Sequence, residues 1–208
     1  MHYSEASTTS ETLTGVAMVL NGKAYQISNV GSSSTYWWYS GYYNIDGLTD
    51  YDRVDASNSS GYLGGSSSPQ LDKDYTVWSV GALSDFSGRN NTEKIIVAQD
   101  DGFTTHTIAY TIVDFRNGAN NWNAQIFDDW YVPAAGQLAF LYLNKDKINT
   151  LLEKCGGRSL GDYRLWTSTE YNADYVWYVD FSYKGEVNYK KKNDMGYSND
   201  YVRFIRDL

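Results

Sequence analysis

Residues 175–182 read Tyr-Val-Trp-Tyr-Val-Asp-Phe-Ser, and large apolar side chains alternate there with more polar ones. Trp177, Val179 and Phe181 share one parity, whereas Tyr178 and Asp180 share the other. A period of two is typical of a β-strand with one buried face and one face in solvent. We therefore predict an antiparallel strand with Trp177, Val179 and Phe181 inward and Tyr178 and Asp180 outward.

Other strands are expected on both sides of this stretch. Lys184-Gly185 predicts a turn into a second short run through Val187 and Tyr189, and residues 201–205 predict a final strand. Near the N-terminus, residues 16–20 and 23–27 flank Asn21-Gly22, which suits a type I′ turn. These signals predict one β-hairpin at each end of the chain.

Helical spacing of apolar residues indicates three helical regions. They are residues 91–98 with Asn91 as N-cap, residues 105–115, and residues 136–154, where Asn144 caps a second segment. The last region carries an apolar stripe and ends at Gly156-Gly157, a typical helix stop. Helices together with antiparallel strands predict an α+β domain.

Composition restricts the class of protein. The chain has 208 residues, a net charge of −8, and 16% aromatic residues that include 20 Tyr and 7 Trp. The acidic balance argues against a nucleic-acid partner, and no apolar run is long enough to insert into a membrane. We expect a flexible lead-in at residues 1–14, without a secretory signal, and a single domain at 15–208. Residues 28–74 predict long loops packed by their own aromatic side chains.

Catalytic and metal-binding motifs are not evident. Cys155 follows an apolar stripe and predicts a small buried side chain, while His2 and His106 are far apart. Carboxylate pairs such as Asp128-Asp129 and Glu170 with Asp174 are as frequent as chance gives in an acidic chain. The tripeptides of calcium-dependent lectins are absent. We therefore expect no catalytic residue, no metal and no cofactor.

The region from Tyr171 to Tyr201 contains seven tyrosines among Asn, Asp, Ser and Lys. Tyrosine offers a large, rigid contact area, and Asn and Ser supply adaptable hydrogen bonds, as in antibody loops. A solvated polar sheet face is the simpler interpretation of the run Lys190-Lys191-Lys192. For the Tyr/Asn set, a binding surface is the better interpretation.

Five short motifs occur in order along the second half of the chain. They are residues 129–133 (DWYVP), 137–142 (QLAFLY), 166–170 (WTSTE), 176–181 (VWYVDF) and 202–206 (VRFIR). Together they resemble the C-type-lectin-fold variable proteins of diversity-generating retroelements, of the type found in Bacteroidales and their phages. The Legionella collagen-like C-terminal domain family is similar. The resemblance is clear from about residue 87 to 208.

This resemblance implies a C-type-lectin-like fold, with two helices packed on a small twisted antiparallel sheet, and a non-enzymatic display protein. It implies a variable region at 166–208 on a constant scaffold of Trp166, Trp177, Val179, Phe181, Val187, Val202 and Arg206. The ligand-binding positions that it implies are Asn172, Asp174, Tyr175, Tyr178, Asp180, Ser182, Tyr183, Asn188, Tyr189, Asn193, Tyr197, Ser198, Asn199 and Asp200. The expected partner is a cell-surface protein or glycan, contacted from a phage tail fibre or from the bacterial surface.

One feature of the chain departs from this family. The family commonly begins its helix with a Ser-based capping box, where this chain has Ala134-Ala135-Gly136-Gln137. The loss of such a cap weakens a helix start by about 1 kcal/mol.

Two other functions remain open, a carbohydrate-active hydrolase and a homotrimeric tail-fibre tip whose tyrosines are buried between subunits.

Overall fold

The computed structural model describes residues 15–20, 22–31, 38, 44–51, 54–55, 79–99, 107–118, 128–182, 185–193 and 200–208. The predicted lead-in, most of the aromatic loop region, both histidines and the predicted site residues Tyr183, Tyr197, Ser198 and Asn199 lie outside these ranges.

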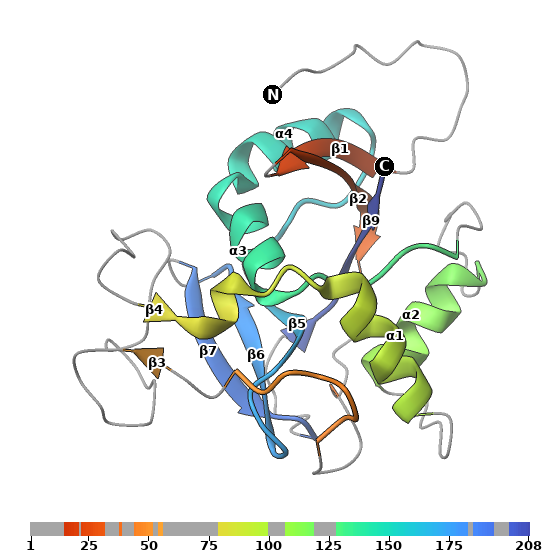
Figure 1. The fold of residues 1–208 in the computed structure, drawn as a ribbon. Coiled ribbons are helices and arrows are strands. Elements are labelled where there is room, and N and C mark those ends of the chain that lie inside the picture. The colour runs from red at the N-terminus through yellow and green to blue at the C-terminus, as the bar shows by residue number, and fades with distance from the viewer. Residues whose placement is uncertain are drawn as a thin grey trace.

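The described residues form a mixed α/β structure with four α-helices (Figure 1). The elements are β1 (Gly15–Leu20), β2 (Lys23–Gly31), β3 (Val54–Asp55), β4 (Ser79–Val80), the 3₁₀ turn η3 (Gly81–Ser84), α1 (Gly88–Ala98), α2 (Ile108–Arg116), α3 (Ala135–Leu143), α4 (Lys145–Lys154), β5 (Arg164–Glu170), β6 (Tyr175–Asp180), β7 (Glu186–Lys191), β8 (Asp200–Tyr201) and β9 (Arg203–Asp207). The α+β class is confirmed, and the four helices fall in the regions that helical spacing predicted, where the resemblance implied two.

Two main sheets divide the strands. One has the order β1-β2-β9, and the other β7-β6-β5-β8; β3 and β4 form a separate short pair. The N-terminal hairpin is confirmed, with Leu20 opposite Lys23 and Gly22 at a φ of +77°. The expected single strand at 201–205 is wrong. The strand is interrupted at Val202. The part before it, β8, pairs in parallel with β5, and the part after it, β9, pairs antiparallel with β2.

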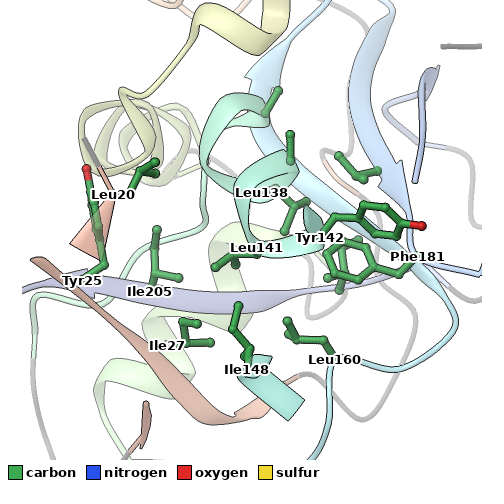
Figure 2. Close-up of a cluster of buried hydrophobic side chains, with 14 of the residues drawn as sticks. Leu20, Tyr25, Ile27, Leu138, Leu141, Tyr142, Ile148, Leu160, Phe181 and Ile205 are labelled. Carbon is green, nitrogen blue, oxygen red and sulfur yellow. The ribbon is translucent and has the colours of Figure 1, made fainter. Parts of the chain in front are cut away.

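A hydrophobic core lies on each face of the four-stranded sheet. The first core joins the three-stranded sheet, α3 and α4 to Trp177, Val179 and Phe181 of the β6 region (Figure 2). The second core joins α1 and α2 to Val176 and Tyr178, on the other face of β6. Both parities of β6 are therefore buried, because helices cover the side that the sequence pattern assigned to solvent.

Helices α3 and α4 confirm the predicted apolar stripe. Leu138, Leu141, Ile148 and Leu152 are buried in the first core, and Cys155 is half-buried against it. The predicted stop is also confirmed. Gly156 has a φ of +66°, and the N–H of Gly157 donates to the carbonyl of Leu152 at 2.8 Å, as in a Schellman motif.

Partners from elsewhere in the chain cap the start of α3, where a Ser is missing. The N–H of Ala135 donates to Oγ1 of Thr169 at 2.8 Å, and the N–H of Gly136 donates to the carbonyl of Asp85 at 3.0 Å. The side chain of Gln137 accepts from the N–H of Ala134 at 2.9 Å. The helix therefore begins where expected because a tertiary hydroxyl replaces the local one.

Helix α1 begins three residues before the predicted N-cap. Asn91 lies inside the helix, where its side chain is buried and donates to Oδ2 of Asp85 at 2.8 Å. Gly88 allows the helix to start early, since a Cβ at this position would lie 2.9 Å from the carbonyl oxygen of Val132. Asn91 thus fixes Asp85 and does not cap the helix.

Replacing Thr169 by Val is expected to lower the free energy of unfolding by about 1–3 kcal/mol, since it leaves the Ala135 N–H and a buried Asp85 oxygen without this hydroxyl. Thr150→Val is the matched control, because the Thr150 hydroxyl donates to Asp146 on the exposed face of α4. Urea denaturation of the two variants measures the difference. Equal losses would mean that the Thr169 hydroxyl caps nothing.

Candidate functional site

The structure separates the predicted binding residues into three groups. Asn172, Asp174, Tyr175, Tyr189 and Asn193 lie where β6 begins and β7 ends. Asp180 and Ser182 lie at the opposite end of the same hairpin, about 17 Å along β6. Tyr178, Asn188 and Asp200 lie on or beside the second-core face of the sheet. The first group is the largest that reaches solvent together.

Four aromatic rings pack against one another at the first of these places, and we call them the aromatic cluster: Tyr171, Tyr175, Trp177 and Tyr189. The rings of Tyr171 and Tyr189 stack with centroids 4.2 Å apart, and Tyr175 meets Tyr189 edge-on at 5.4 Å. Trp177 is fully buried beneath them and donates from Nε1 to the carbonyl of Tyr51 at 3.0 Å. The three tyrosines are half-buried, so each offers part of its ring to solvent.

A tight turn places Tyr171 beside Tyr175. Oδ1 of Asn172 accepts from the N–H of Asp174 at 2.9 Å and from that of Tyr175 at 3.1 Å. The Asn172 side chain is therefore used to shape the turn, while Asp174 is exposed at its tip. Tyr171 was missing from the predicted site. The run Asn172-Ala173-Asp174 was the available signal, because Asn and Asp favour turns.

An ion pair buried under this end of the sheet joins Glu170 of β5 to Lys192, which follows β7. Both side chains are fully buried, and Nζ of Lys192 donates to Oε1 of Glu170. Burial raises the pKa of Glu170 and lowers that of Lys192, while the pairing opposes both shifts. Glu170 is thus committed to the interior and does not form a surface pair with Asp174.

The same ion pair fixes the segment that precedes β3. The N–H of Ile45 donates to Oε1 of Glu170 at 3.3 Å, and the N–H of Trp38 donates to the carbonyl of Lys192 at 3.0 Å. Nζ of Lys192 also lies 5.3 Å from the centroid of the Trp38 ring. Tyr51 hydrogen-bonds to the carbonyl of Glu170 as well. The aromatic cluster therefore sits on a base that is anchored from three segments.

A charged network lies on the second-core face of the four-stranded sheet, opposite the face that carries the aromatic cluster. Arg164 lies 3.6 Å from Asp180 and 3.7 Å from Asp200, and Lys190 lies 2.5 Å from Asp200. The Arg164 guanidinium also lies 5.5 Å from the centroid of the Tyr178 ring. These contacts tie Asp180 and Asp200 to the scaffold.

Tyr178 corrects the predicted outward orientation. Its side chain is only 8% exposed and meets Trp166 edge-on at 6.4 Å. Burial is also the main cause of the raised pKa of its hydroxyl. Asn188 and Asp200 are 7% and 2% exposed. These three predicted positions offer little contact area, because Tyr178 belongs to the second core and Asn188 and Asp200 are buried beside it.

The part of the chain that the structure describes contains no group of three or more His, Cys, Asp or Glu side chains placed to hold a metal ion. It also contains no helix with the length and apolar character needed to cross a membrane.

Asp129, from a predicted carboxylate pair, lies 3.4 Å from Arg206 and 3.9 Å from Arg89.

Replacing Lys192 by Met is expected to lower the free energy of unfolding by about 3–5 kcal/mol, because Glu170 is left as an unpaired buried charge. The loss should grow as the pH rises above about 4.5. Burial raises the pKa of Glu170 in the folded state above its value in the unfolded state. As the pH rises, the unfolded state loses this proton first, and the free energy of unfolding therefore falls.

The double variant Glu170→Gln/Lys192→Met is the control, and it should recover part of this stability and lose the added pH dependence. Chemical denaturation at pH 5 and pH 8 measures both effects. If the single and double variants are equally destabilised at both pH values, the pair does not act as a unit.

Comparisons with known proteins identify no family. No family model and no curated protein matches the sequence. Among solved structures, the chain is similar to a fimbrial protein from Bacteroides ovatus ATCC 8483, with a TM-score of 0.49 and 17% sequence identity. The match covers 88% of this chain and 35% of the length of that protein.

Proposed function

We propose that this chain is a non-enzymatic ligand-binding domain with a C-type-lectin-like fold, and that the aromatic cluster is its contact surface. The partner would be a cell-surface protein or glycan, met from a phage tail fibre or from a bacterial surface. No metal or cofactor takes part in this proposal.

The observation that carries the proposal is a set of three half-buried tyrosines packed against one another on a rigid base. Tyr171, Tyr175 and Tyr189 are held by one another, by Trp177 and by the sheet, so little conformational entropy is lost when a partner covers them. A tyrosine ring also offers an apolar face and a polar hydroxyl, a combination favoured at interfaces.

Polar side chains border the cluster and can provide specificity. Asp174 and Lys191 are exposed, and Lys191 lies directly opposite Tyr175 in the β6–β7 pair. Asn193 follows two residues after β7 and is half-exposed. A rim of one carboxylate, one ammonium and one amide around aromatic rings suits a polar partner with apolar patches, such as a glycan or a protein loop.

Diversification of this surface is part of the proposal. Asp174, Tyr175 and Asn193 reach solvent, whereas Trp166, Trp177 and Val179 are completely buried. Changes at the first set alter the contact surface without opening a cavity in either core. Tyr178, Asn188 and Asp200 do not suit such variation, because they are buried.

The carbohydrate-active hydrolase is less well supported by the described carboxylates. Glu170 is buried in an ion pair, and Asp129 and Asp180 face arginines. A glycosidase needs two carboxyl groups that flank one bond of the sugar. A hydrolysis screen with glycosides should therefore give no turnover.

Tyr175→Ala should lower binding to a glycan array or to a panel of surface-protein ectodomains by about tenfold or more, as loss of a central aromatic contact does in other interfaces. Tyr110→Ala is the matched control, since Tyr110 is a half-buried tyrosine on α2, far from the cluster in sequence. Melting temperatures show whether each variant is folded. Equal binding by both variants, with both folded, would contradict the proposed surface.

Tolerance to substitution gives a second test. Asp174→Asn and Asn193→Tyr should each change the free energy of unfolding by less than about 1 kcal/mol, and Tyr175→Ser should lower it by about 1–2 kcal/mol because it removes two ring contacts. Tyr178→Ser should cost about 3 kcal/mol or more, because it removes a buried ring from the second core. Thermal melts of the four variants provide the measurement. If Tyr178→Ser leaves the stability unchanged, the Tyr178 side chain points to solvent, as the sequence pattern predicted, and is not part of the second core.

A further inference from the structure

Strand β1 is an open edge of the three-stranded sheet. Among the described residues it pairs with β2 alone, and the two-residue turn makes Leu20 and Lys23 a hydrogen-bonded pair. Hydrogen-bonded and non-hydrogen-bonded pairs alternate along an antiparallel ladder, so the N–H and C=O groups of Gly15, Ala17 and Val19 point away from β2. The N–H of Leu208 donates to the carbonyl of Ala24, which confirms that Ala24, the partner of Val19, faces β9.

The outward backbone groups of β1 are free among the described residues. Outside the pairing of β1 with β2, no described residue forms a hydrogen bond with the N–H or C=O group of Gly15, Ala17 or Val19. Proteins usually guard such an edge with a charged side chain, a proline or a bulge. Strand β1, with the sequence GVAMVL, has neither a charged residue nor a proline, and its pairing with β2 is regular.

An exposed apolar row continues from this edge across the solvent side of the sheet. Val19 is 61% exposed and Leu208 is 62% exposed, and Ala24 lies between them in the register. Strand β1 and this row carry no charged side chain, on a chain whose net charge is −8. Two copies of so acidic a chain repel each other least where neither copy carries charge.

We propose that β1 pairs antiparallel with β1 of a second copy, around a two-fold axis at Ala17. In this register Ala17 faces Ala17 of the other copy, and Val19 faces Gly15. Every outward N–H and C=O group of the three residues then finds a partner, which gives six hydrogen bonds across the axis. The two three-stranded sheets become one sheet of six strands.

The side chains of β1 fit this register. Val19 meets a glycine and Ala17 meets an alanine, so no two large side chains compete for space on the solvent side. Val16 and Met18 are buried in the core of their own copy and need not move. A two-fold interface is self-complementary and closes at two copies, which distinguishes it from the trimeric tail-fibre alternative.

Sedimentation velocity of the full chain over a range of about 1 to 200 µM tests the association. The interface is small, so we expect a reversible dimer with a dissociation constant on the order of micromolar. Val19→Lys should weaken it at least about tenfold by placing a charge at the edge. Ala17→Pro should do the same, and it breaks no bond between β1 and β2, because the N–H of Ala17 points outward.

Val97→Lys is the matched control, since Val97 is 74% exposed on α1 and far from the edge. Circular dichroism melts confirm that each variant is folded. A monomer at all concentrations, a trimer, or a dimer that survives both edge variants would overturn the proposal.

Cysteine cross-linking tests the register independently. In a Cys155→Ser background, Ala17→Cys should form a disulfide between copies under mild oxidation, because the two Cα atoms would be about 5.5 Å apart, within the usual range for a disulfide. Val19→Cys should not, since its symmetry mate would be about 14 Å away, four residues along the neighbouring strand. Cross-linking at Val19 and not at Ala17 would overturn the two-fold register.

Discussion

The buried polar run from Thr167 to Glu170 constrains the arrangement of the rest of the chain. These four residues lie in a central strand and are at most 1% exposed, so each polar group needs a partner inside the protein. The partners come from distant segments: Thr169 donates its hydroxyl proton to Asp85, the backbone N–H of Ser168 donates to the carbonyl of Pro133, and Glu170 accepts from Lys192 through Oε1. The hydroxyl of Ser168 and Oε2 of Glu170 have no hydrogen-bond partner among the described residues. Leaving one such group without a partner costs about 1–3 kcal/mol, and more if it is charged. The run thus acts as the junction at which α1, α3 and the end of β7 meet.

This junction explains why the candidate binding surface lies at the end of the sheet. The two cores bury both faces of β6, and the charged network around Arg164 and Asp200 occupies what remains of the second face. Side chains reach solvent together chiefly where β6 begins and β7 ends, directly above the Glu170–Lys192 pair. An aromatic surface on such a base is preorganised, which favours binding by rigid contact.

The open edge of β1 belongs to the other main sheet. Figure 1 shows β1 and β2 of the three-stranded sheet far from the β6–β7 hairpin, at different ends of the molecule. The proposed self-association through β1 and the proposed partner binding through the aromatic cluster therefore use separate surfaces. Two copies joined at β1 present two aromatic clusters, and a partner with repeated epitopes then gains from the second contact without any new interaction.

Local sequence determined the features that depend on near neighbours. Asn21-Gly22 predicted the first hairpin, the stripe from Leu138 to Leu152 predicted α3 and α4, and alternation predicted the buried positions of Trp177, Val179 and Phe181. Tertiary structure decided the rest. Thr169 caps α3 from a position 34 residues away, and Asp85 binds Thr169 across 84 residues. Tyr178 is buried because α1 and α2 build a second core on its face. Spacing along the chain shows which residues share a face, but only packing between distant segments decides whether that face is covered.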